Sequence, residues 1–321
     1  MQRRHFFALP GLALAAPAIA RAQGFDRPFR LVVPFAPGGT SDILGRILAP
    51  ELTRLLGQNV VVENRSGAAG NLGAELVARS APDGQTLLLI DTGVLATAPA
   101  LFTRLPFEPL RDLAPVNLLI YAPYILAVHP SVPAANAAEF VALARRAPNS
   151  INVAHSGVGA ANHLTALMLT QAWGAELTQV PYRGGAAALA AVTGGEAQMI
   201  INGATATAPF VKDGRLRGIA VSGPRRLPDF PNLPTFAELG WPAQESGTWQ
   251  GVLVQGATPA PIVARLDDAF RQALAVPDVA RRMAELGAEV RAMGAAPFRQ
   301  WLVGETEAWG RVVRANNIKL D

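Results

Sequence analysis

Short apolar runs and longer segments with helical periodicity alternate along most of the chain. The runs that we expect to form strands are residues 30–35, 59–63, 86–90, 124–128, 151–154, 179–180, 199–202, 216–221 and 251–254. Several are continuous in Val, Leu and Ile, as is typical of strands covered on both faces. The alternation predicts an α/β protein with a mainly parallel sheet flanked by helices.

Apolar residues recur at helical spacing from Ile43 to Leu56, and Gly57 follows where glycine commonly ends a helix. Pro50 is expected to kink this helix. Further helices are expected over residues 136–145 and 163–173, from Pro261, from Pro277 to just before residue 287, and over 297–316. Residues 91–119 and 225–250 lack periodicity and are rich in proline, so we expect irregular segments there that carry the crossings between two lobes.

The N-terminus has the pattern of an export signal. Arg3 and Arg4 form a twin-arginine pair, residues 8–19 are apolar, and Ala20-Arg21-Ala22 offers a small-residue cleavage site. The apolar stretch is too short to span a bilayer. We therefore expect residues 1–22 to be a twin-arginine-type signal peptide that is cleaved near Ala22, which places the mature protein in the periplasm; an uncleaved anchor is the alternative.

Composition excludes several classes of function. The chain has 28 basic and 24 acidic side chains. Three of the basic ones, Arg3, Arg4 and Arg21, lie in the expected signal peptide, which leaves a net charge of +1. With no basic stripe, nucleic acid is not expected as a partner. The absence of cysteine excludes disulfides, thiolate zinc sites and cysteine nucleophiles.

Two segments combine a strand, a glycine turn and a helix start: VPFAPGGTSD at 33–42 and INVAHSGVGAANH at 151–163. Backbone N–H groups in such turns converge on one point, and the helix dipole adds partial positive charge there. The turns can therefore attract an anion without lysine or arginine. Two such turns in an exported protein indicate capture of a carboxylate.

Further motifs complete an ordered set: VENRSGAAG at 62–70, PDGQTLL at 82–88, PYRGG at 181–185 and LPTFAELG at 233–240. Together with the two turns, this set resembles the Bug family, the solute receptors of tripartite tricarboxylate transporters. The match keeps the family order and covers nearly the whole mature chain. The resemblance implies a two-lobed periplasmic binding protein of type II-like architecture, with residues 23–124 and 249–321 in one lobe, residues 125–248 in the other, and the ligand cleft between them.

The resemblance also implies which residues grip the ligand carboxylate, one turn from each lobe. The positions carried over are Phe35, Ala36, Gly38, Gly39, Thr40, Ser41, His155, Ser156, Gly157, Gly159 and Asn162, with Arg183 and Gly185 from the PYRGG motif. The family often carries Ser or Thr where this chain has Ala160, which removes a hydroxyl donor. It usually carries Asp where this chain has Ala191, so the carboxylate that the family associates with recognising an amino group or fixing water is absent from that position.

For some charged and imidazole side chains near these motifs, a structural role is the alternative to binding the ligand. Asp42 lies in the first helical turn, where a carboxylate complements the helix dipole, so a structural role is expected. His163 is expected to be packed and hydrogen-bonded. Arg65 and Arg183 are candidates for steering or gripping a second carboxylate, and their alternative is a solvated charge.

A competing signal is a near match to a dinucleotide fingerprint at residues 157–162, with Glu176 further on. Its third glycine is missing, and Glu176 precedes a strand instead of ending one. This keeps an exported oxidoreductase with a nucleotide cofactor as an alternative. A ligand-sensing adaptor for a membrane sensor is another. No Gly-x-Ser-x-Gly or His-Glu-x-x-His occurs.

The expected function is a monomeric receptor that captures a small organic carboxylate, with transporter membrane subunits as its partners. We expect no catalytic residue, no cofactor and no metal site.

Overall fold

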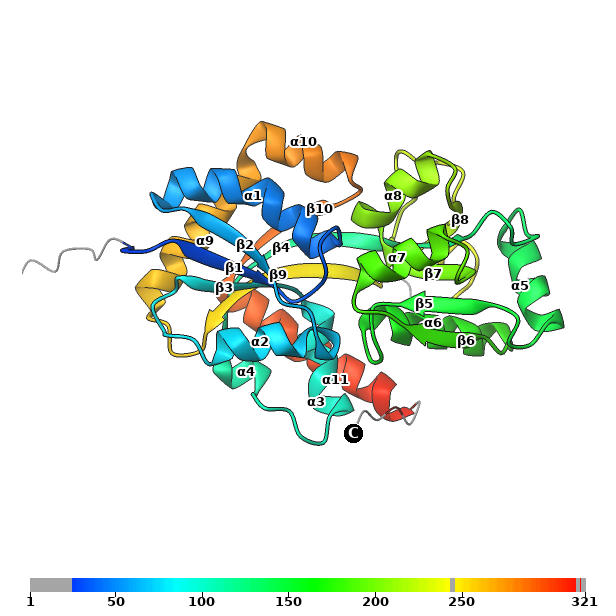
Figure 1. Ribbon diagram of the computed structural model, residues 1–321, viewed down its shortest axis with the longest axis horizontal. Coiled ribbons are helices and arrows are strands. Elements are labelled where there is room, and N and C mark those ends of the chain that lie inside the picture. The colour runs from blue at the N-terminus through cyan, green and yellow to red at the C-terminus, as the bar shows by residue number, and fades with distance from the viewer. Residues whose placement is uncertain (1–24, 243–245, 316–317, 319–321) are drawn as a thin grey trace, which may run out of the picture.

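The computed structural model describes residues 25–242, 246–315 and 318, and the expected signal peptide lies outside this part of the chain. Figure 1 shows two lobes side by side, each a sheet with helices on both faces. Among the described residues, no helix is long and apolar enough to cross a membrane. The two-lobed α/β architecture confirms the fold class expected from the sequence.

The sheet of the first lobe is built from both ends of the described chain. Its strands are β1 (Phe29–Val33), β2 (Val60–Asn64), β3 (Thr86–Asp91), β4 (Leu113–Val128), β9 (Gly247–Gln255) and β10 (Glu289–Gly294). β1 lies parallel to β2 and β3, whereas β9 is antiparallel to β3 and β4, and β10 is antiparallel to β4.

The sheet of the second lobe comes from the middle of the chain. Its strands are β5 (Asn152–His155), β6 (Thr178–Pro181), β7 (Met199–Gly203) and β8 (Arg217–Val221), together with the end of β4. β5 is parallel to β6 and β7, and β4 is antiparallel to β7 and β8. Both sheets are therefore mixed, not mainly parallel, because the strands that link the lobes run against the others.

Two strands, not irregular segments, connect the lobes. β4 pairs with β9 up to Pro123 and with β7 from Tyr124 onward. β9 begins at Gly247, so the return crossing is also extended backbone. The expectation of irregular crossings within residues 91–119 and 225–250 was wrong at these points. The division at residues 124–125 and 248–249 stays a prediction.

Helices cover both faces of each sheet (Figure 1). In the first lobe they are α1 (Thr40–Leu56), α2 (Asn71–Ala78), α3 (Thr92–Leu101), α4 (Pro109–Asp112), α9 (Ala260–Ala275), α10 (Pro277–Glu285) and α11 (Ala295–Ala315), with a 3-10 turn at Ala68–Gly70. In the second lobe they are α5 (Ala137–Arg146), α6 (Ala161–Trp173), α7 (Gly185–Thr193) and α8 (Ala204–Lys212). Among the described residues, four apolar cores, two in each lobe, fill the space between helices and sheets, and a small fifth cluster joins Leu101 and Val313 of the first lobe to Leu164 of the second.

The sequence pattern missed α2, α3, α7, α8 and β10, and the structure gives the physical reason for α3 and β10. α3 is buried along nearly all of Thr92–Ala98, so it lacks the polar face that gives a helix its period, and Pro99 lies inside it. β10 is a half-exposed edge strand, with Val290 41% exposed, so it lacks an apolar run. Pro50 lies within the continuous helix α1.

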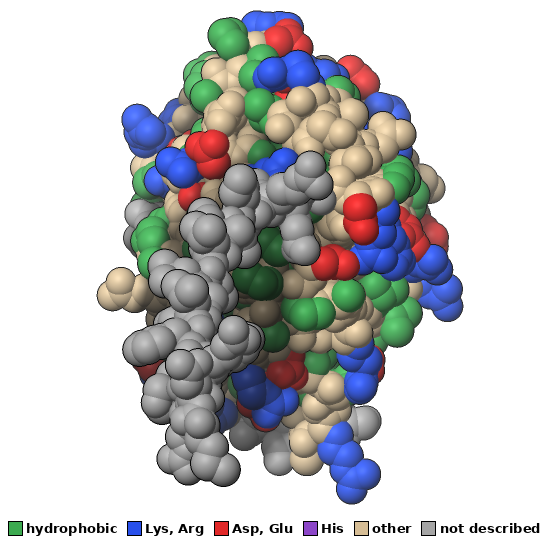
Figure 2. Space-filling model, turned by 90° about the vertical axis from the view of Figure 1, so that its left-hand side faces the viewer, with side chains coloured by type: hydrophobic (Ala, Val, Ile, Leu, Met, Phe, Trp, Pro, Cys, Tyr) green, Lys and Arg blue, Asp and Glu red, His purple; other side chains and the backbone are tan. Residues whose placement is uncertain are grey.

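The outer end of the first lobe is electrically mixed. On the part of this face that Figure 2 leaves uncovered, basic and acidic side chains are interspersed. In the first lobe, ion pairs join Arg54 to Glu51 on α1 and Arg281 to Glu285 on α10.

Candidate functional site

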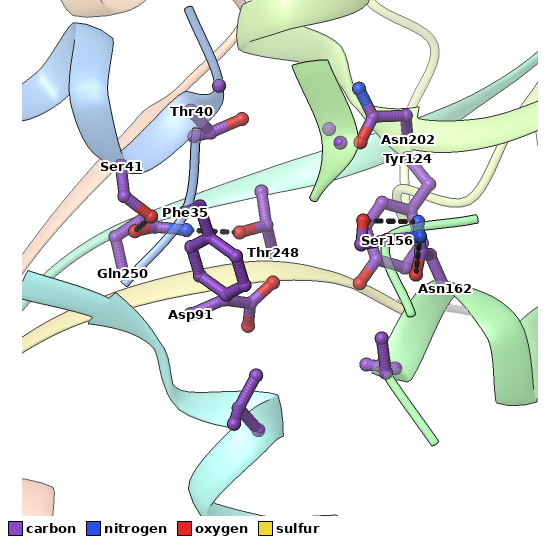
Figure 3. Close-up of a pocket in the computed structure, with 16 residues that line it drawn as sticks. Phe35, Thr40, Ser41, Asp91, Tyr124, Ser156, Asn162, Asn202, Thr248 and Gln250 are labelled. Atoms are coloured by element: carbon purple, nitrogen blue, oxygen red, sulfur yellow. Dashed lines mark hydrogen bonds between the residues drawn. The ribbon is translucent and has the colours of Figure 1, made fainter. Parts of the chain in front are cut away.

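A cavity of about 50 Å³ lies where the lobes meet. This is several times the roughly 10–15 Å³ that one water molecule needs. Sixteen residues from both lobes line it (Figure 3). They are Phe35, Gly39, Thr40, Ser41, Asp91, Val94, Tyr124, Ser156, Ala160, Ala161, Asn162, Gly185, Asn202, Gly203, Thr248 and Gln250.

Five helices begin at this cavity. α1 and α3 come from the first lobe, and α6, α7 and α8 come from the second. The lining residues at or beside their starts are Gly39, Asp91, Ala160, Gly185 and Gly203. The first turn of a helix has N–H groups without an intrahelical partner and carries partial positive charge. Main-chain groups of both lobes therefore give the cavity the polarity that favours an anion.

The turn before α1 is held in shape by Asp42. Its carboxylate accepts a hydrogen bond from the Gly38 amide at 2.9 Å and further bonds from Arg46 and Asn64. Burial acts to raise the pKa of Asp42, but the bonds from Arg46, Gly38 and Asn64 outweigh it and hold that pKa below its usual value. The structural role expected of Asp42 is confirmed, and the Gly38 amide is already engaged.

The turn before α6 is held by Asn162. Its side-chain amide donates to the Ser156 hydroxyl at 2.9 Å and to the Ile201 carbonyl at 3.0 Å, which ties the loop to β7. Ser156 and Asn162 both face the cavity, as Figure 3 shows. These two residues therefore supply fixed polar groups from the second lobe.

His155 and His163 lie behind this turn and not in the cavity lining. Nδ1 of His155 donates to the Gly157 carbonyl at 2.9 Å, Nδ1 of His163 accepts from the Gly159 amide at 3.1 Å, and the rings stack with centroids 4.2 Å apart. Burial lowers the pKa of His155 to about 4, and burial together with the charge of His155 lowers the pKa of His163 to about 3. Both imidazoles are neutral supports of the loop.

A chain of hydrogen bonds forms the wall of the first lobe. The Ser41 hydroxyl donates to Oε1 of Gln250 at 2.7 Å, Nε2 of Gln250 donates to the Thr248 hydroxyl, and Thr248 bonds to the Asp91 carboxylate. Sequence reasoning missed this wall. Asp91 and Gly203 end strands β3 and β7, and the carboxyl ends of parallel strands are where ligands bind in open α/β sheets, so that signal was available.

The structure brings only part of the expected set to the cavity. The lining includes Phe35, Gly39, Thr40, Ser41, Ser156, Asn162 and Gly185. It does not include Ala36, Gly38, His155, Gly157, Gly159 and Arg183. Arg183 is exposed, and Arg65 is ion-paired with Glu63, so neither guanidinium reaches this wall.

Residues 157–162 and Glu176 do not have the geometry of a dinucleotide-binding site. Glu176 is exposed and precedes β6, whereas the ribose-binding acid of a dinucleotide site ends a strand. Among the described residues, no cluster of three or more His, Cys, Asp or Glu could hold a metal ion.

Comparison with known proteins identifies the family. The model of the tripartite tricarboxylate transporter family receptor matches residues 44–318. The chain belongs to this family. The Bug resemblance seen in the sequence is thereby confirmed: the receptor is 31% identical to BugT of Bordetella pertussis over 325 residues, which covers 100% of each chain.

Solved structures of similar proteins carry the same two lobes. MatC from Rhodopseudomonas palustris with bound malate is 33% identical, with a TM-score of 0.85, and the match covers 89% of this receptor and 99% of MatC. A second R. palustris protein, Rpa4515 with adipate, is 32% identical with a TM-score of 0.87, and the match covers 92% and 99% of the two chains.

Proposed function

We propose that this chain is a periplasmic receptor that captures a small organic carboxylate between its lobes and delivers it to membrane subunits of a tripartite tricarboxylate-type transporter. One observation carries the proposal: five helix starts, from both lobes, converge on a cavity whose described lining contains no Lys, Arg or His. Malate in MatC and adipate in Rpa4515, both dicarboxylates, support this choice of ligand class.

The energetics suit reversible capture. Hydrogen bonds to a charged group contribute roughly 1.5–3 kcal/mol each. A few of them, shared between the starts of α1 and α6, support micromolar affinity, which needs about −8 kcal/mol. Thr40 and Ser156 add hydroxyl donors to the main-chain amides, whereas the Ser41 hydroxyl already donates to Gln250.

We infer that the lobes close around the ligand by rotation about the two crossing strands. β4 changes partners between Pro123 and Tyr124, and β9 begins beside it at Gly247. Residues 23–124 and 249–321 then move against residues 125–248 as hinged bodies. Among the described lining residues there is no Ser–His pair or carboxylate pair of the kind that catalysis uses, which supports binding without chemistry.

Calorimetry and thermal shift on the dialysed protein test the proposal. Mono-, di- and tricarboxylates are compared with their uncharged amides as matched controls. We expect at least one carboxylate to bind and raise the melting temperature, and its amide to have no effect. Absence of binding by every carboxylate, or equal binding by an amide, contradicts the proposal.

A proline variant tests the helix starts themselves. Ala161 is the first residue of α6, and Ala160 already has the extended conformation (φ −61°, ψ 150°) that precedes proline comfortably. Ala161→Pro removes one amide donor and keeps the helix, so we expect a loss of affinity of about tenfold or more. Ala137→Pro, at the first residue of α5 at the far end of the second lobe, is the matched control and leaves affinity unchanged.

A further inference from the structure

The cavity contains a negative charge of its own. Asp91 is the only Asp or Glu among the sixteen lining residues, and the described lining contains no Lys, Arg or His to balance it. Among the described ion pairs, none includes Asp91. Figure 3 shows its carboxylate near Thr248 and Phe35, on the cavity side of the first lobe. A site suited to anions thus holds an unbalanced carboxylate.

Asp91 is ionised at neutral pH. Burial raises its pKa to about 6, while the Thr248 hydroxyl and the amides of Gly93 and Trp249 donate to it and limit the rise. The Gly93 amide lies 3.1 Å from Oδ1. These bonds, and the N-terminus of α3 that Asp91 caps, favour the charged form.

This charge restricts what the cavity can take. A ligand carboxylate at the starts of α1 and α6 shares a small space with the Asp91 carboxylate, and like charges in a partly desolvated site repel strongly. A cationic group on the ligand, next to its carboxylate, removes the repulsion and forms a charge-assisted hydrogen bond with Asp91. A hydroxyl group donates a hydrogen bond but brings no charge, and a methylene group does neither.

Building on the proposed function, we infer that Asp91 is the specificity-determining residue of the cavity and selects ligands with an ammonium group beside the carboxylate, which are amino-acid zwitterions. The carboxylate of the ligand binds the helix starts, and its ammonium group binds Asp91. Tyr124 of β4 is the other ionisable side chain of the lining. Burial and the charge of Asp91 raise the pKa of Tyr124, so it stays neutral and adds no charge.

Two matched series of acids test this inference by calorimetry at neutral pH. Propionate, lactate and alanine differ only in carrying hydrogen, hydroxyl or ammonium beside the carboxylate, and so do succinate, malate and aspartate. In at least one series we expect the amino acid to bind about tenfold or more tighter than the unsubstituted acid, because a charge-assisted hydrogen bond is worth that much. The hydroxy acid should fall between them.

The Asp91→Asn variant removes the charge and keeps the shape. Asparagine caps helix starts as well as aspartate does, so α3 retains its cap. We expect the preference for the amino acid to fall by about tenfold or more, with the unsubstituted acid gaining affinity. Glu305→Gln is the control: burial also raises the pKa of Glu305, which lies on α11 outside the cavity lining, and this variant keeps the wild-type preference.

Each outcome decides between the claims. Equal binding of succinate and aspartate and of propionate and alanine, tightest binding of the hydroxy acid, or an unchanged preference in Asp91→Asn overturns the inference and leaves the carboxylate receptor standing. Failure of all six acids, and of every other carboxylate in the wider screen, overturns the proposed function together with the inference.

Discussion

Gly157 in the second lobe packs directly against Ala69 in the first. A Cβ placed on Gly157 would lie 3.1 Å from the Cβ of Ala69. The Gly157 backbone has φ +137°, a conformation that residues other than glycine rarely adopt. Ala69 belongs to the 3-10 turn Ala68–Gly70 and has φ +52° itself. The loop before α6 therefore meets the first lobe at a contact that only glycine fits closely.

Substitution of Gly157 tests this contact. In Gly157→Ala the added methyl group presses on Ala69 and strains the backbone by about 1–3 kcal/mol. We expect ligand affinity to fall about tenfold, because the closed arrangement is penalised more than the open one. Calorimetry measures the change.

Gly174→Ala is the matched control for Gly157→Ala. Gly174 ends α6 with φ +59°, and a Cβ added to it would meet no other atom within 4 Å. The variant should lose about 1–2 kcal/mol of stability and keep its affinity. Equal affinities of the two variants would show that the Gly157–Ala69 contact plays no part in closure.

Ser41→Ala tests the hydrogen-bonded wall of the first lobe. It leaves Oε1 of the buried Gln250 without its 2.7 Å donor, so we expect the free energy of unfolding to fall by about 1–3 kcal/mol. Urea denaturation measures this change. Ser150→Ala removes an exposed hydroxyl that bonds to the Ala147 carbonyl and should cost clearly less. A similar cost for both variants would contradict the role given to the wall.

Acid should destabilise the protein through the paired histidines. Unfolded His155 and His163 take up protons near their ordinary pKa of 6.5, but folded they do so only near 4 and 3. Their contribution to stability is complete above about pH 6.5 and falls on acidification by about 1.4 kcal/mol per pH unit for each histidine, down to the folded values. Asp91 has the opposite effect between about pH 6 and pH 3.8. On acidification the folded protein protonates Asp91 before the unfolded chain does, which favours the folded state.

Urea midpoints measured from pH 7.5 to pH 4.5 test the histidine contribution. His163→Gln removes one of the two protonation sites, and its glutamine oxygen can still accept from the Gly159 amide. We expect the stability of this variant to depend less steeply on pH than that of the wild type. Parallel curves would show that His163 is not held neutral by the fold.

The Arg183→Ala variant tests whether Arg183 steers the ligand toward the cavity or binds it directly. Its guanidinium is exposed and lies outside the cavity lining, so we expect Arg183→Ala to slow ligand association at low salt and to leave affinity at high salt within about twofold. Stopped-flow measurements at two salt concentrations separate the effects. A large loss of affinity at high salt would place Arg183 against the ligand.

The sequence predicted the features that repeat locally. The apolar runs at β1 and β3 and the period of α1 come from residues that face a core, so pattern and structure agree. The glycine turns before α1 and α6 are visible for the same reason: strand, glycine and helix start follow one another directly. The mixture of parallel and antiparallel strands in each sheet could not be predicted from the sequence, because the direction of β9 depends on partners far away in the chain.

The missed parts of the site have a common cause. Asp91, Thr248 and Gln250 meet through the pairing of β3 with β9, and no local pattern indicates that register. His155 was expected at the cavity from the family resemblance, but its ring turns toward Gly157 and His163. Side-chain direction at a strand end is decided by packing that the sequence alone does not display.

A crystal structure of the receptor with its bound acid tests the central claim most directly. We expect one carboxylate of the ligand to lie within hydrogen-bond distance of main-chain amides at the starts of α1 and α6, between Ser41 and Asn162. A carboxylate bound elsewhere, or one held by side-chain cations instead of these amides, would contradict the account.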